Sequence, residues 1–144
     1  MEHPDCPLCR DPGGLLVASA PRWRVIRAAE PDFPAFYRVI WQDHAAEFSD
    51  LSPTDREACM AVVIAVEQVL RQALTPTKIN LATLGNVVPH LHWHVIARFD
   101  WDSHFPNPVW GERRQTLDTE AATRLAVALP ELDARVREAV AALA

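Results

Sequence analysis

Short apolar segments rich in β-prone residues recur five times along the chain, separated by turn-forming residues. We expect strands over residues 15–18, 23–28, 36–41, 78–84 and 91–98. The connection after the first segment contains Ser19-Ala20-Pro21, and Gly85-Asn86 forms the turn after the fourth. Such short connections favour antiparallel pairing, since parallel strands need long crossovers.

Two regions have helical spacing instead. Ser52-Pro53-Thr54-Asp55 is a strong helix start, with an N-cap serine, proline at the first helical position and an acid in the first turn. Apolar residues then follow helical spacing as far as Thr75-Pro76. From Leu117 onward the pattern is helical again, with an interruption at Pro130 and a stripe at Leu132, Val136, Val140 and Leu143. The predicted class is α+β: a five-stranded antiparallel sheet, one main helix and C-terminal helices.

Composition narrows the function classes. A chain of 144 residues predicts a single domain over 1–144, and 49% apolar with 23% charged residues is typical of a soluble globular protein. The net charge of −5 gives no footprint for a nucleic acid polymer. No segment resembles a membrane span or a signal peptide, so a cytoplasmic location is the default expectation.

Three alternating histidines, His90, His92 and His94, are the main chemical signal. On a strand they point to one face, while Leu91, Trp93 and Val95 point to the other. Three interpretations are open: hydrogen-bonded structural histidines, a metal site, or nucleophilic catalysis by imidazole.

The fuller pattern resembles the histidine triad (HIT) family of nucleotide hydrolases and transferases. His90-Leu91-His92-Trp93-His94-Val95-Ile96 matches the family signature His-φ-His-φ-His-φ-φ, where φ is apolar. Gly85-Asn86-Val87-Val88-Pro89 resembles the Gly-Gln-x-Val-x that precedes it, and the region from Pro34 to Leu51 resembles the segment before the family's first helix. The resemblance covers about residues 6–111 and leaves 112–144 as a C-terminal helical extension.

The resemblance implies a role for each residue. His92 attacks the α-phosphorus of a nucleotide ester, anhydride or phosphoramidate, and water hydrolyses the covalent nucleotidyl-histidine. His94 binds phosphate and assists the leaving group, while His90 orients His92 by a hydrogen bond. Asn86 stands where the family has a phosphate-binding Gln, one methylene longer. The implied substrates are dinucleoside polyphosphates or nucleoside phosphoramidates, with no organic cofactor, and members commonly form homodimers.

A zinc site is also implied by the resemblance. Cys6 and Cys9 have a Cys-x-x-Cys spacing, which is weak evidence alone. Some HIT proteins and the related galactose-1-phosphate uridylyltransferases bind a structural zinc through such a pair and two histidines. The matching histidines here are His44 and His90, which would complete a closed tetrahedral site.

Two departures and one further residue complete the predictions. Phe36 stands where the family usually has a histidine, and Ala28 stands where an acid or Asn often binds the ribose. Nucleotide selectivity is therefore open. By strand parity Arg98 lies on the histidine face, where it either contacts phosphate or faces solvent at the strand end. Two rival functions remain: a regulator that binds nucleotide with little turnover, and an enzyme whose triad ligates a metal.

Overall fold

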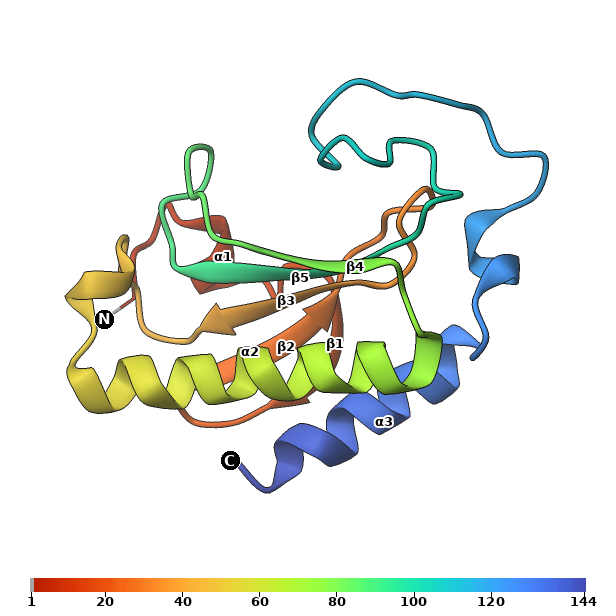
Figure 1. Ribbon diagram of the computed structural model, residues 1–144. Coiled ribbons are helices and arrows are strands. Elements are labelled where there is room, and N and C mark those ends of the chain that lie inside the picture. Colours follow the sequence, from red (N-terminus) through yellow and green to blue (C-terminus); the bar gives the residue numbers. More distant parts are fainter. Residues whose placement is uncertain (1) are drawn as a thin grey trace.

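In the computed structural model, which describes residues 2–144, five strands form one antiparallel sheet (Figure 1). They are β1 (Leu15–Ser19), β2 (Trp23–Arg27), β3 (Phe36–Trp41), β4 (Lys78–Ala82) and β5 (His92–Arg98). Their order across the sheet is β1-β2-β3-β5-β4. The predicted α+β class and five-stranded antiparallel sheet are confirmed. Because β5 lies between β3 and β4, the residues on it are supported from both sides.

The main helix, α2 (Pro53–Leu74), packs along one face of the sheet (Figure 1). It begins as predicted: the Ser52 hydroxyl accepts a 3.2 Å hydrogen bond from the backbone N–H of Asp55. It ends at Thr75, which has a left-handed φ of 46°. Its buried stripe against the sheet consists of Cys59, Val62, Val63, Val66, Leu70 and Leu74. Helical spacing of apolar residues therefore positioned this helix correctly.

Strand alternation gives the sheet two different faces. Tyr37, Val39 and Trp41 belong to the main core together with α2. Phe36, Arg38 and Ile40 alternate with them and so lie on the opposite face. On β5, Val95 is in the main core, while His94 pairs with Arg38 across the strands. The face away from α2 is thus the one that presents the candidate chemistry.

The C-terminal region differs from the prediction. Residues 112–120 contain no helix, and helical structure is limited to the 3₁₀ turn η2 (Ala121–Arg124) and α3 (Leu129–Ala141). Pro130 lies in the first turn of α3 and interrupts nothing, because first-turn N–H groups have no intrahelical acceptor for proline to remove. Leu143 lies beyond α3, so the predicted stripe stops at Val140.

Helix α3 is fixed to the sheet by a buried carboxylate. Asp133 accepts a 2.6 Å hydrogen bond from the Tyr37 hydroxyl and forms an ion pair with Arg27 at 3.0 Å. Burial raises the pKa of Tyr37, and its hydrogen bond to Asp133 raises it further, so the phenol stays protonated as the donor. This network ties α3 to β2 and β3.

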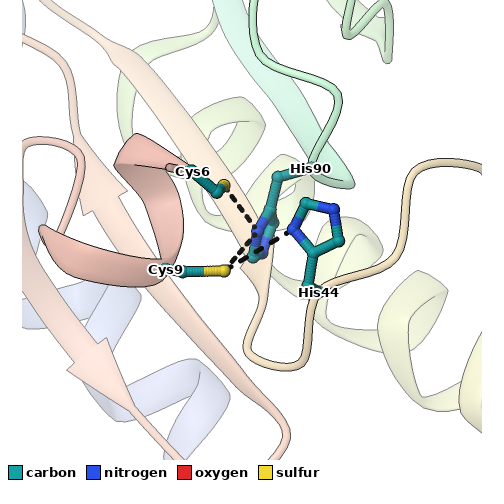
Figure 2. Close-up of side chains that lie close together, drawn as sticks. All are labelled: Cys6, Cys9, His44 and His90. Carbon is teal, nitrogen blue, oxygen red and sulfur yellow. Dashed lines mark hydrogen bonds between the residues drawn. The ribbon is translucent and has the colours of Figure 1, made fainter. Parts of the chain in front are cut away.

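One short helix, α1 (Pro7–Arg10), was not predicted. Its four residues are too few to show a helical period. It lies near the start of β5 and brings two cysteines to that end of the sheet (Figures 1 and 2). Among residues 2–144 no helix combines the length and apolar character needed to cross a bilayer.

Candidate active site and metal centre

His92 is the first residue of β5, and one of its ring nitrogens is hydrogen-bonded to the main chain. Its Nδ1 lies 2.6 Å from the backbone carbonyl oxygen of His90. A carbonyl only accepts, so Nδ1 carries the proton and Nε2 keeps its lone pair. Burial lowers the pKa of His92, and the positive charge of Arg38 lowers it further. The result is a neutral imidazole with a free Nε2, which is the form required of a nucleophile.

His94 lies beside it, with ring centroids 5.0 Å apart, and is only 5% exposed. The Nε of Arg38 donates to its Nδ1 at 3.4 Å, so the proton of the neutral ring is on Nε2. Burial, followed by the influence of His92 and Arg38, lowers the pKa of His94 to about 3. His94 is therefore a neutral hydrogen-bond donor at physiological pH.

His90 has a different environment from the other two histidines. It precedes β5 and is fully buried, and its Nε2 donates to the backbone carbonyl of Trp41 at 2.6 Å. Its Nδ1 lone pair therefore faces the sulfur atoms of Cys6 and Cys9 (Figure 2). The hydrogen bond that orients His92 runs from its own Nδ1–H to the main-chain carbonyl of His90. The ring of His90 belongs to the neighbouring cluster.

That cluster is the predicted metal set, and the structure brings its four members together (Figure 2). Cys6 is the N-cap of α1 and Cys9 lies within it. His44 comes from the segment after β3, and His90 comes from just before β5. The ligand atoms of Cys6, Cys9, His44 and His90 all lie within 4.8 Å of one another.

The distances in the cluster match a tetrahedral zinc site. The Sγ–Nδ1 separations are 3.4 Å for Cys6–His90, 3.5 Å for Cys9–His44 and 3.6 Å for Cys9–His90. Zinc bonds of about 2.3 Å to sulfur and 2.0–2.1 Å to nitrogen, at tetrahedral angles, place such atoms about 3.6 Å apart. Two thiolates and two imidazoles also leave no open position, which is typical of a structural site. The residues present therefore fit zinc.

A cleft of about 390 Å³ opens beside His92. It is lined by Leu8, Arg38, Leu84, Asn86, Val87, Val88, His92 and Trp110. Asn86 lies on it, as its proposed phosphate contact requires. Arg38 and Trp110 also line it, and Arg38 was not among the predicted site residues. A charged residue in an otherwise apolar strand was the available signal for Arg38, and an aromatic-rich loop was the signal for Trp110.

Arg98 is occupied elsewhere. The residue is 1% exposed. Its guanidinium donates to the Asp102 carboxylate at 2.8 and 3.1 Å, to Asn80 at 2.9 Å and to the carbonyl of Asn107 at 2.7 Å. The solvent-facing alternative is therefore wrong, and these acceptors leave Arg98 in a structural network apart from the cleft.

The two departures from the family pattern form an apolar cluster. Phe36 and Ala28 pack with Phe33 and Ile96 on the triad face, which is the face of the sheet that carries His92 and His94. Phe36 also meets His94 edge-on, with centroids 5.5 Å apart. Ala28 thus places a buried apolar side chain where the family often has a ribose-binding acid.

The fold and the site together define a small α+β protein with a histidine centre on the middle of its sheet. The HIT domain model matches residues 14–101, and the chain belongs to the HIT family. Membership supports a function in nucleotide binding. Comparison with curated proteins gives no match.

Solved structures with the same fold include several bacterial histidine triad proteins. One from Bradyrhizobium japonicum is 26% identical, with a TM-score of 0.72, over 90% of this chain and 92% of that one. One from Sinorhizobium meliloti is 27% identical, with a TM-score of 0.69, over 88% and 90%. A zinc-bound family member from Mycobacterium smegmatis is 20% identical, with a TM-score of 0.58, over 90% and 86%.

Proposed function

We propose that this chain is a hydrolase or nucleotidyl transferase acting on nucleoside phosphates, of the dinucleoside polyphosphate or nucleoside phosphoramidate type. The observation that carries the proposal is the hydrogen bond from Nδ1 of His92 to the His90 carbonyl. It leaves Nε2 as the unprotonated nitrogen of a residue that lines the cleft. A neutral imidazole held in one tautomer is a competent nucleophile toward phosphorus.

The proposed reaction has two steps. Nε2 of His92 forms a bond to the α-phosphorus as the bond to the leaving oxygen or nitrogen breaks. The N–H at Nε2 of His94 donates a hydrogen bond to the leaving group, which takes its proton from solvent. A water then attacks the same phosphorus, the P–N bond to His92 breaks, and the proton of that water passes to solvent. The product is a nucleoside monophosphate. Asn86, on the rim of the cleft, is proposed to donate to a phosphate oxygen.

Intact-mass analysis tests this mechanism. Wild-type protein is incubated with adenylyl phosphoramidate or a diadenosine polyphosphate, and product release is followed in parallel. We expect an adenylyl adduct on the protein or steady turnover, and His92→Asn is expected to lose the adduct and at least ~10³-fold in turnover. Equal behaviour of wild type and His92→Asn would contradict a covalent role for His92.

The same experiment separates the two alternative functions. A nucleotide-binding regulator would bind AMP without forming adduct or product. The apolar Ala28, at the position of the family's ribose-binding acid, favours this alternative and argues against strict adenosine selectivity. An enzyme with a metal on His92 and His94 would lose activity on chelation. Among residues 2–144 the metal-type cluster contains His90 but neither His92 nor His94, which favours nucleophilic catalysis.

We also propose that Cys6, Cys9, His44 and His90 hold a structural zinc ion. The donor set and its spacing support this, as does the zinc-bound relative from Mycobacterium smegmatis. When bound, the ion would cross-link α1 to the start of β5 and keep both cysteines as thiolates. A reducing compartment such as the cytoplasm suits thiolate ligands.

A homodimer is the proposed assembly. Strand β4 is an edge of the sheet, and Leu81 on it and Ile64 on α2 are 40% and 46% exposed. Light scattering of the purified protein is expected to give about twice the chain mass of 16.1 kDa. A monomer at micromolar concentration would contradict this assembly.

A further inference from the structure

Arg38 lies at the centre of the triad face, on β3, directly opposite His94 on β5. It is half-buried, lines the cleft with His92 and donates through Nε to Nδ1 of His94 at 3.4 Å. The guanidinium carbon lies 5.2 Å from the Phe36 ring centroid, so the aromatic face supports it from one side. A strand in the middle of a sheet and a ring beneath it hold this side chain in place.

Two buried arginines elsewhere in the chain donate hydrogen bonds from their guanidinium groups to protein acceptors. Arg24 donates to backbone carbonyls of Leu8, Asp11 and Pro12 and to Gln42. Arg98 donates four hydrogen bonds, to Asp102, Asn80 and Asn107. Arg38 uses only Nε, and within residues 2–144 its two terminal nitrogens have no hydrogen-bond acceptor and its charge has no ion-pair partner.

The cleft needs a positive charge that its histidines do not supply. A nucleoside phosphate brings negative charge, while His94 is a neutral donor. Among the residues that line the cleft, Arg38 is the cationic one. Burial lowers the pKa of Arg38, while the charge of Glu30, beyond ion-pair distance, acts in the opposite direction; a guanidinium remains protonated in proteins. An uncompensated guanidinium beside a neutral nucleophile is suited to two-point binding of phosphate oxygens.

We propose that Arg38 is a catalytic residue of this chain: its terminal nitrogens bind the non-bridging oxygens of the phosphate that His92 attacks, while its Nε holds His94 in the tautomer that donates from Nε2. This inference rests on the function proposed above and adds to it the source of positive charge in the transition state. The group that Arg38 recognises is a phosphoryl group with two non-bridging oxygens, and this recognition does not depend on the nucleobase. Catalysis thereby depends on β3 as well as on β5.

Two variants and a matched control test the proposal. Arg38→Gln removes the charge, and Arg38→Lys keeps the charge but loses the planar fork. Arg71→Gln makes the first change at an exposed position on α2. With adenylyl phosphoramidate, Arg38→Gln is expected to lose at least ~100-fold in kcat/KM, Arg38→Lys is expected to recover part of it, and Arg71→Gln is expected to match wild type.

Binding and spectroscopy provide readouts that do not need turnover. AMP affinity, measured by calorimetry, is expected to fall at least ~10-fold in Arg38→Gln, because a charge-assisted contact to phosphate is lost. Nitrogen NMR of His94 is expected to show a single Nε2–H tautomer in the wild type and a mixture in Arg38→Gln. A purely structural role for Arg38 would lower thermal stability but leave AMP affinity and the tautomer unchanged.

The outcomes separate this proposal from the proposed function. One outcome is that Arg38→Gln keeps the kcat/KM and AMP affinity of the wild type while His92→Asn loses the adduct. This outcome would overturn the role of Arg38 and keep the proposed function. Absence of adduct and turnover in the wild type, with AMP binding that depends on Arg38, would overturn the hydrolase and keep the phosphate contact. Wild-type protein that does not bind AMP would overturn both.

Discussion

Removal of zinc is expected to lower the melting temperature of the protein by roughly 10 °C or more, because a structural zinc site stabilises a small domain by several kcal/mol. A chelator, or Cys9→Ser, would remove the cross-link between α1 and the start of β5 and leave Nδ1 of the buried His90 ring without a metal ion. Metal analysis of the purified protein is expected to find one zinc per chain, and calorimetric melting with and without chelator measures the loss.

Cys59→Ser is the matched control for Cys9→Ser. Cys59 is fully buried in α2, and burial raises the pKa of its thiol to about 11, so it is an inert core residue. The control is expected to retain zinc and to lose only the modest stability that a buried hydroxyl costs. Protein that contains no metal and melts at the same temperature with chelator would rule out the site.

His90 links the metal centre to the proposed nucleophile. Its ring is directed at the cysteines, and its backbone carbonyl accepts the Nδ1 proton of His92. A displaced His90 ring would move that carbonyl and release His92 to exchange tautomers. Zinc loss is therefore expected to affect the chemistry as well as the stability, even though no zinc ligand except His90 belongs to the triad.

The regular elements were predictable because their signals are local. Strand segments and the Ser52 N-cap each depend on a few neighbouring residues, and the structure matches them closely. The α1 turn and the position of Pro130 were missed because four residues show no period and proline is as compatible with a helix start as with a break.

The candidate site was predictable only as far as the family pattern reached. The Cys and His members of the metal cluster came from the resemblance, and the structure places them together. Arg38 and Arg98 show the limit: parity puts both on the triad face. Which one stays free depends on acceptors that only the folded chain reveals, namely Asp102 in the loop after β5 and none comparable beside Arg38 within residues 2–144.

Asp102 organises the loop that carries Trp110 to the cleft. Its carboxylate accepts two bonds from Arg98 and three from the backbone N–H groups of Phe99, His104 and Phe105. Burial alone would raise the pKa of Asp102, but the bond from Arg98 and those backbone donors hold it below its usual range. The carboxylate is therefore charged, paired and 2% exposed.

Asp102→Asn is expected to destabilise the protein by about 3–5 kcal/mol, since it leaves the buried Arg98 charge without its counter-ion and turns an amide NH₂ toward N–H donors. A depressed folded pKa means that this contribution is present above the unfolded value of about 3.9 and is lost as pH falls through the folded pKa. Urea unfolding at neutral pH and near pH 3 is expected to show a large difference in stability between wild type and Asp102→Asn that narrows in acid.

Asp100→Asn, the same change at an exposed neighbour, should leave stability within about 0.5 kcal/mol of wild type. Because the loop also places the Trp110 ring 5.0 Å from His94, Asp102→Asn should raise KM for a nucleotide substrate. Wild-type stability in Asp102→Asn would show that the Arg98 charge finds another partner.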